Sequence, residues 1–211
     1  KKIYLKMYTV EAVTENEFSF LELRNKDKTS FARICLEEGG RLQDLKFKDV
    51  FLIKEQPNLD YTASYASSIL FPFVSRIQDG KYSFQGKEYQ LDCNQLGENA
   101  LHGLVYNKKF ELIEKEENTL SCSVTIRYKE TKESQGFPYM YEIYVTYLLT
   151  EKEIRLSVKI NNSDTKPYPF TLGWHPYFIS DNLSKSSLSF KSDKKIAFDE
   201  NLITKEVIDF K

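Results

Sequence analysis

The sequence is poor in several features that mark common classes of protein. Its 211 residues include only three cysteines, two histidines, one tryptophan and eight glycines. Thirty lysines and arginines stand against 31 aspartates and glutamates, so the formal net charge is -1. This balance provides no excess of one sign that would attract a nucleic acid or an anionic membrane. We therefore predict neither of these partners.

Long apolar runs and paired cysteines are also missing. The longest uncharged apolar stretch, around Ile69 to Val74, is far shorter than the roughly 20 residues of a membrane-spanning helix. Cys35, Cys93 and Cys122 show no paired spacing, and each lies in or beside an apolar stretch. We expect reduced core thiols, with no disulfide and no metal site. The chain opens at Lys1 without a signal-peptide pattern, and the cytoplasm is the predicted compartment.

Apolar residues alternate with polar ones along much of the chain, which is rich in Tyr (14) and Phe (15). The clearest apolar face recurs at every second residue from Tyr141 to Leu149, and similar alternation covers 120–128 and 154–160. Shorter runs of this type occupy 18–23, 31–36, 109–114, 187–190 and 196–198. Because we find no amphipathic helix longer than two turns, the pattern predicts one all-β domain over residues 1–211, an antiparallel sandwich or barrel.

Two irregular stretches contain the histidines. His175 lies beside Trp174 in an aromatic stretch that spans 169–178, and His102 lies in the stretch 97–104. An imidazole among aromatic side chains suits proton transfer on a small polyhydroxylated ligand, and it suits a hydrogen-bonded core residue equally well. The residues alone leave both interpretations open.

A predicted hairpin connects Arg76 with His102. The turn signals Asp79-Gly80 and Gln85-Gly86 bracket a short strand between them. A hairpin at this place brings its two flanks together. We therefore expect Arg76 and His102 to line one mouth of the fold.

Six motifs, taken in order and spacing, resemble those of the aldose 1-epimerase (galactose mutarotase) family. The motifs are Gly39-Gly40-Arg41-Leu42, Ser75-Arg76-Ile77, the run 80–91, Asn99-Ala100-Leu101-His102-Gly103, Gly136-Phe137-Pro138 and His175-Pro176-Tyr177-Phe178. The resemblance implies a large antiparallel β-sandwich, called a supersandwich, that binds a sugar in a cleft on one sheet. It also implies an isomerase that interconverts the α and β anomers of a free hexose and uses neither a metal nor an organic cofactor.

The resemblance also implies roles for individual residues. His175 matches the catalytic general acid of the family, His102 its companion catalytic histidine, and Arg76 its substrate-binding arginine. Pro176 and Tyr177 match substrate-binding positions. Ser75 also matches one, where the family usually has Asn, so one hydrogen bond to the sugar is altered or lost. The sequence Trp174-His175-Pro176-Tyr177 is similar to a bacterial subgroup whose substrates are often undefined, so the identity of the sugar stays open.

The general base of the family is a Glu near the C-terminus, and no acid of this chain matches it. Asp79, Glu88, Glu98 and Asp181 lie at other positions. We therefore expect this domain to lack its C-terminal portion, with the base beyond Lys211. Two alternatives stay open: a hexose-6-phosphate 1-epimerase, and a non-catalytic carbohydrate-binding protein on the same fold. The oligomeric state is not predicted.

Overall fold

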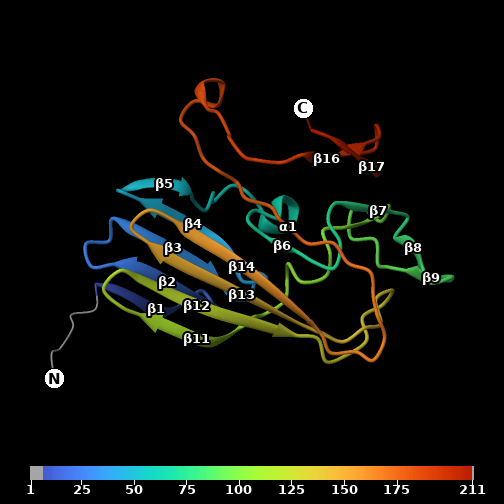
Figure 1. The fold of residues 1–211 in the computed structure, drawn as a ribbon, viewed down its shortest axis with the longest axis horizontal. Coiled ribbons are helices and arrows are strands. Elements are labelled where there is room, and N and C mark those ends of the chain that lie inside the picture. The colour runs from blue at the N-terminus through green and yellow to red at the C-terminus, as the bar shows by residue number, and fades with distance from the viewer. Residues whose placement is uncertain (1–6, 211) are drawn as a thin grey trace.

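The computed structural model describes residues 7–210, which form two main antiparallel sheets (Figure 1). The first sheet consists, in spatial order, of β1 (Tyr8–Glu15), β2 (Phe18–Asn25), β3 (Ser30–Cys35), β4 (Arg41–Phe47) and β5 (Val50–Ile53). The second consists of β11 (Glu111–Glu117), β12 (Ser121–Lys129), β13 (Tyr141–Thr150) and β14 (Ile154–Asn162). In both sheets the spatial order follows the chain, so each strand pairs with its sequence neighbour.

Shorter elements connect and follow the two sheets. Between them lie α1 (Tyr61–Ser64), β6 (Ile69–Leu70), β7 (Arg76–Gln78), β8 (Lys81–Phe84), β9 (Lys87–Gln90) and β10 (Asn99–Leu101). After them come β15 (Gly173–Trp174), the 3₁₀ turn η1 (Leu183–Lys185), β16 (Lys194–Phe198) and β17 (Thr204–Asp209). None of the helices in residues 7–210 is long and apolar enough to cross a membrane.

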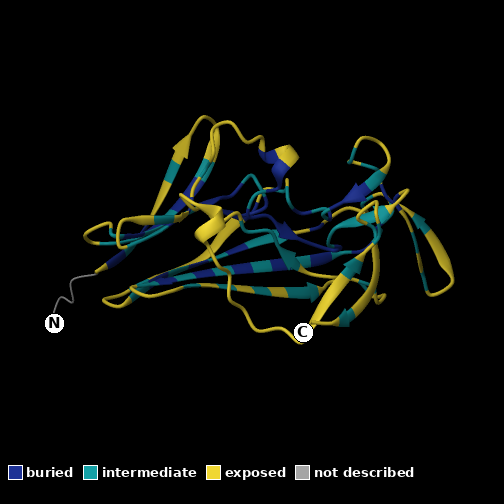
Figure 2. Cartoon of the chain, turned by 90° about the horizontal axis from the view of Figure 1, so that it is seen from above, coloured by how far each residue is buried: buried dark blue, intermediate teal, exposed yellow. Residues whose placement is uncertain are grey.

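The core lies between the two main sheets. On β13 the predicted apolar face is fully buried, because Tyr141, Ile143, Val145, Tyr147 and Leu149 all point inward. These side chains join those of the first sheet in one cluster, and Figure 2 shows the buried residues along the facing strands. On β13, and on β12 from Cys122 to Ile126, every second side chain is buried, which is the signature of a sandwich with one solvated face per sheet. The predicted all-β antiparallel sandwich is confirmed.

Several predicted strands differ in detail. Leu120 precedes β12 and is 78% exposed, so the buried face of that strand begins at Cys122. The run 109–114 corresponds to β11, which is shifted toward the C-terminus. No strand forms at 187–190, where Leu188 and Phe190 are exposed. That prediction is wrong because an apolar alternation becomes a strand only where another strand pairs with it.

Among the strands that were not predicted are β1, β4, β5 and β17, and the turns explain two of these. Asn16 and Glu17 connect β1 to β2 with φ values of 48° and 71°. Lys48 and Asp49 connect β4 to β5 with φ values of 49° and 63°. These are two-residue hairpin turns of the type that usually contains glycine. Because neither contains one, the sequence carries no strong signal for them.

The cysteines lie largely as expected. Cys35 and Cys122 are buried free thiols in the core, and Cys93 is half-buried. Burial raises the pKa of both core thiols to about 12. A thiol that stays protonated at neutral pH is a poor nucleophile and a poor metal ligand. Cys35 and Cys122 therefore act as small apolar core residues.

Candidate active site

The backbone of His175 is fixed beside β6. Directly before it, β15 pairs with β6 through Gly173–Leu70 and Trp174–Ile69. The His175 N–H then donates to the Ser68 carbonyl over 3.1 Å, and the His175 carbonyl accepts from the Ser67 N–H over 2.7 Å. The aromatic stretch around His175 is therefore tied to the chain segment that leads into Arg76.

The backbone of His102 is fixed to the same segment from the other side. It follows β10, which pairs with β7 so that Leu101 lies opposite Arg76. The His102 N–H donates to the Ser75 carbonyl over 3.1 Å. At the next residue a Cβ would lie 2.3 Å from the Phe71 carbonyl oxygen, so only glycine fits at Gly103. This close approach holds the His102 loop against the end of β6.

The two histidine rings lie together at the meeting point of these segments. Their centroids are 5.1 Å apart and their planes cross at 75°. The Nδ1 atom of each ring is buried and has no hydrogen-bond partner among residues 7–210. The Nε2 atoms are not enclosed, which leaves them as the ring atoms available to a ligand. The aromatic rings of Tyr65 and Tyr177 flank the pair, at 4.9 Å from His102 and 5.3 Å from His175 respectively.

The surroundings of His102 favour its neutral form. Burial is the largest cause, followed by the positive charges of His175 and Arg76, and together they lower the pKa of His102 to about 4. At neutral pH its ring therefore carries one proton and can donate or accept one hydrogen bond without being an acid.

Arg76 lies on β7, and its side chain is half-buried. Its Nε donates to the amide oxygen of Gln95 over 2.8 Å. Both residues line an open cleft of about 710 Å³, which the loop 93–99 and the later residues Asp199, Asn201 and Ile203 also enclose. The predicted hairpin of β8 and β9 is present, and its flanks β7 and β10 are paired. The backbones of Arg76 and His102 thus come together, whereas His102 is not among the residues that line this cleft.

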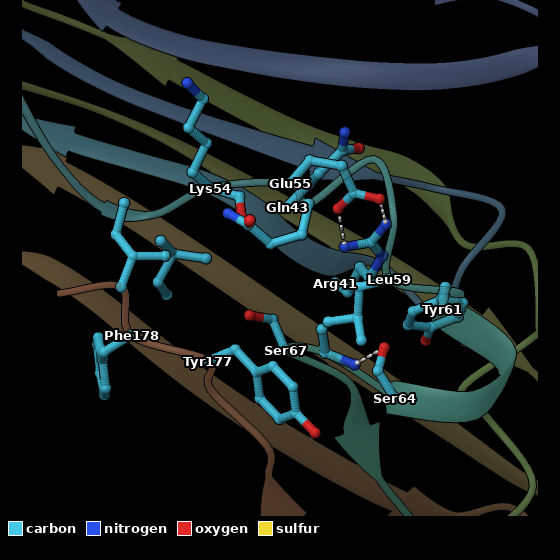
Figure 3. Close-up of a pocket in the computed structure, with 14 residues that line it drawn as sticks. Arg41, Gln43, Lys54, Glu55, Leu59, Tyr61, Ser64, Ser67, Tyr177 and Phe178 are labelled. Atoms are coloured by element: carbon cyan, nitrogen blue, oxygen red, sulfur yellow. Dashed lines mark hydrogen bonds and ion pairs between the residues drawn. The ribbon is translucent and has the colours of Figure 1, made fainter. Parts of the chain in front are cut away.

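The other predicted binding residues lie around this site. Ser75 has a φ of 63° and contributes its carbonyl to the His102 backbone. Pro176 is half-buried and Tyr177 is 40% exposed. The Tyr177 side chain also lines a second, smaller cavity of about 110 Å³ beside Arg41, Glu55 and Ser67 (Figure 3). This second cavity adjoins the histidine pair through Tyr177.

Figure 3 shows how Arg41 is bound in that smaller cavity. Its guanidinium forms two hydrogen bonds to Glu55, at 2.9 and 3.0 Å, and one to Glu38 at 2.5 Å. It also lies 4.5 Å from the centre of the Tyr61 ring. Burial opposes the charge, but the two carboxylates outweigh it and raise the pKa of Arg41 above its ordinary value. Arg41 is therefore a structural cation.

Sequence reasoning missed three residues that hold the site together. Gln95 binds Arg76, Tyr65 packs on His102, and Asn94 bonds to both the N–H and the carbonyl of Leu101 at 2.7 and 3.0 Å. The irregular composition of residues 61–70 was the only signal for Tyr65. Gln95 and Asn94 lie just before the stretch 97–104 and carry no distinctive motif.

The acids near the site form no ion pair with Arg76. Asp79 and Glu98 line its cleft, while Glu88 is exposed on β9 and Asp181 is exposed after the aromatic stretch. Within residues 7–210 no three His, Cys, Asp or Glu side chains are grouped as a metal site requires. Arg76 therefore lies in a cleft lined by residues of both charges, and the two histidine rings lie together outside the residues that line this cleft.

The aldose 1-epimerase family model matches this chain over residues 20–211. The chain therefore belongs to the aldose 1-epimerase family, and the expected resemblance is confirmed.

Individual relatives agree with this membership. The Escherichia coli protein YihR is 27% identical over 168 residues, which cover 77% of this chain and 53% of YihR. The galactose mutarotase of Sus scrofa is 28% identical over 144 residues, or 66% of this chain and 41% of that protein. This chain spans about half the length of the curated relatives that it matches.

Solved structures show the same fold. A galactose mutarotase-like protein from Clostridium acetobutylicum superposes with a TM-score of 0.80 at 20% identity, covering 96% of this chain and 65% of that one. The galactose 1-epimerase of Lactobacillus acidophilus superposes with a TM-score of 0.64 at 13% identity, covering 81% and 53%. At these identities the likeness concerns the fold, which is the galactose mutarotase-like sandwich.

Proposed function

We propose that the protein is an aldose 1-epimerase that interconverts the α and β anomers of a free hexose. The observation that carries this proposal is the pair of adjacent histidines with available Nε2 atoms, next to an arginine whose terminal nitrogens make no hydrogen bond within residues 7–210. His175 and His102 are the proposed catalytic residues. Arg76, Ser75, Pro176 and Tyr177 are the proposed substrate-binding residues.

The proposed reaction opens and recloses the pyranose ring. A base takes the proton from the C1 hydroxyl, the bond between C1 and the ring oxygen breaks, and the protonated His175 gives its proton to that oxygen. The open-chain aldehyde rotates about C1–C2 and closes on its other face, and the two groups then exchange protons in reverse. We assign the role of the base to none of the acids within residues 7–210.

The unequal surroundings of the histidines support this division of roles. Because the pKa of His102 is lowered to about 4, its ring is neutral at the working pH and holds a hydroxyl by a hydrogen bond. His175, which matches the general acid of the family, is the residue that we propose to carry the transferable proton. General acid–base help of this kind typically accelerates a reaction by about 10² to 10⁴.

The charges near the site support a neutral sugar over a sugar phosphate. A phosphate requires several cationic groups that converge on it. In the larger cleft Arg76 and Lys81 are accompanied by Asp79, Glu98 and Asp199. In the smaller cavity Arg41 is occupied by its two carboxylate partners. The hexose-6-phosphate alternative therefore ranks second, and a comparison of rates on glucose and glucose 6-phosphate separates the two.

Polarimetry of freshly dissolved α-D-glucose and α-D-galactose tests the proposal. The full-length protein is expected to accelerate the decay of optical rotation, and the His175→Asn variant to lose this activity while it still binds the sugar in calorimetry. Decay at the buffer rate across several aldoses contradicts the proposal. If the sugar nevertheless binds, the protein is a non-catalytic carbohydrate-binding protein.

The cytoplasm remains the predicted compartment.

A further inference from the structure

Arg76 differs from every other arginine of the chain in its ion pairing. The sequence contains six arginines, all within the described residues. Five of them form an ion pair with a carboxylate, namely Arg24, Arg33, Arg41, Arg127 and Arg155. Arg76 has no carboxylate within ion-pair distance among residues 7–210, and its side-chain partner is the neutral amide of Gln95. Its charge is therefore uncompensated at the proposed sugar site.

The loop that carries Gln95 is tied at several points. The Gln95 N–H donates to the Asn99 carbonyl over 3.1 Å, and the Gln95 carbonyl accepts from the Glu98 N–H over 2.9 Å. Next to it, the Asn94 side chain binds both polar groups of the Leu101 backbone. Leu101 lies opposite Arg76 on the paired strands β10 and β7, so these hydrogen bonds connect the loop to the strand pair that carries Arg76. Gln95 thus approaches Arg76 from a loop that is hydrogen-bonded to that pair.

We propose that Gln95 is a positioning residue that orients the Arg76 guanidinium toward the sugar through Nε while it leaves the positive charge intact. The terminal nitrogens of Arg76 make no hydrogen bond within residues 7–210 and stay free for sugar hydroxyls. A carboxylate at this position would orient Arg76 equally well, but it would neutralise the charge. The inference rests on the proposed function because it assigns Arg76 to the sugar.

The free charge of Arg76 also affects His102. The groups that face the His102 ring are His175, Arg76 and the Tyr65 ring, and no carboxylate is among them. The uncompensated charge of Arg76 therefore helps to keep His102 neutral. A negative charge at residue 95 opposes this effect, so the pKa of His102 reports on the role of Gln95 independently of catalysis.

Two substitutions of Gln95 separate orientation from charge, and both belong in the full-length protein. Gln95→Leu removes the acceptor, and we expect KM for the sugar to rise about tenfold with kcat changed less than about twofold, since one hydrogen bond to a charged group is lost. Gln95→Glu keeps the acceptor, and we expect KM within roughly threefold of the wild-type value. The matched control is Gln135→Leu, an exposed glutamine that makes no side-chain hydrogen bond within residues 7–210.

NMR titration of the His102 ring provides the second measurement, with a His102→Gln variant to assign the signal. In Gln95→Glu we expect the pKa of His102 to rise by roughly half a unit or more above the wild-type value. An unchanged His102 pKa in Gln95→Glu, or an unchanged KM in Gln95→Leu, overturns the inference. If the wild-type protein mutarotates no sugar, the proposed function fails, while the titration still decides whether Gln95 controls the electrostatics of this cleft. If Gln95→Leu does not fold, Gln95→Glu carries the test.

Discussion

Arg41 and Arg76 begin β4 and β7, and each follows a residue with positive φ. Gly40 precedes Arg41 with a φ of 67°, and Ser75 precedes Arg76 with a φ of 63°. The surroundings of the two guanidinium groups are opposite. Arg41 is 3% exposed and binds two carboxylates, whereas Arg76 is half-buried and binds one neutral amide. The same local backbone geometry thus serves two different purposes.

The difference shows which of the two charges is available to a ligand. A buried cation is tolerated only when counter-charges and hydrogen bonds satisfy it, and each of the three guanidinium nitrogens of Arg41 already binds a carboxylate. A partly exposed cation keeps its hydration and needs no carboxylate, so Arg76 retains free donors at the cleft. We infer that Arg41 supports the fold and that Arg76 belongs to the site.

The largest expected contrast comes from removing each guanidinium. Arg41→Met leaves Glu38 and Glu55 without their buried partner, and we expect it to lower the free energy of unfolding by about 3 kcal/mol. Arg76→Met breaks no ion pair and is expected to cost less than about 1 kcal/mol while it weakens sugar binding. Urea unfolding and calorimetry with the sugar measure both effects. Equal losses of stability in the two variants would contradict the comparison.

The residues before the two arginines provide the next contrast. A Cβ at Gly40 would lie 2.3 Å from Cδ1 of Ile126 and would adopt an unfavourable φ, so Gly40→Ala is expected to cost about 2 kcal/mol. Ser75 already carries a Cβ at its positive φ. Ser75→Ala is therefore expected to change the free energy of unfolding by less than about 0.5 kcal/mol. Thermal unfolding of both variants measures this difference in stability. Similar shifts in Tm for Gly40→Ala and Ser75→Ala would show that backbone strain is equal at the two sites and would contradict the prediction.

A smaller effect concerns pH. The pKa of His102 is about 4 in the folded protein, against an ordinary value of 6.5. Since the unfolded chain binds the proton more readily, His102 contributes stability above pH 6.5, and this contribution falls as the pH drops toward 4. Urea unfolding between pH 6.5 and 4 should show this loss of unfolding free energy. His102→Gln should remove the part of the pH dependence that comes from His102. Arg76→Met removes a charge that lowers the His102 pKa, so it should narrow the pH range over which this stability is lost. Arg41→Met should leave that range unchanged.

The smallest expected effect is at Ser75. Asn adopts positive φ more readily than Ser, so Ser75→Asn is expected to stabilise the protein by roughly 0.5 kcal/mol. It also restores the residue that the family usually has before this arginine, so we expect KM for the sugar to fall. A differential scanning experiment with parallel rate measurements checks both results. A lower Tm would mean that the cleft lacks room for the longer side chain.

Part of the fold was predictable because it depends on local patterns. The alternation in β13 identified all five buried residues of its inner face, and Gln85-Gly86 identified the hairpin of β8 and β9. In contrast, the turns at Asn16-Glu17 and Lys48-Asp49 contain no glycine, so β1 and β5 were missed. Their positive φ values are imposed by the pairing of the flanking strands, and such strain depends on tertiary structure.

The sequence predicted which types of residue form the candidate site. It predicted only in part which residues hold them in place. The ordered motifs identified Arg76, His102 and His175, whose side chains we propose to carry the chemistry. They did not identify Gln95 or Tyr65, because an amide acceptor and an aromatic contact are common residue types that gain a role only through position. The carboxylate partners of Arg41 were missed for the same reason.

The sequence by itself determined the strand pattern, the buried face of the second sheet and the types of residue that can transfer a proton or bind a hydroxyl. These properties follow from the period of two in the side-chain directions and from the chemistry of imidazole and guanidinium groups. The tertiary structure alone decided which arginine is neutralised and which stays free, and it set the two histidine rings 5.1 Å apart. Charge compensation and pKa shifts depend on distances between segments that are remote along the chain, and only the folded sandwich sets those distances.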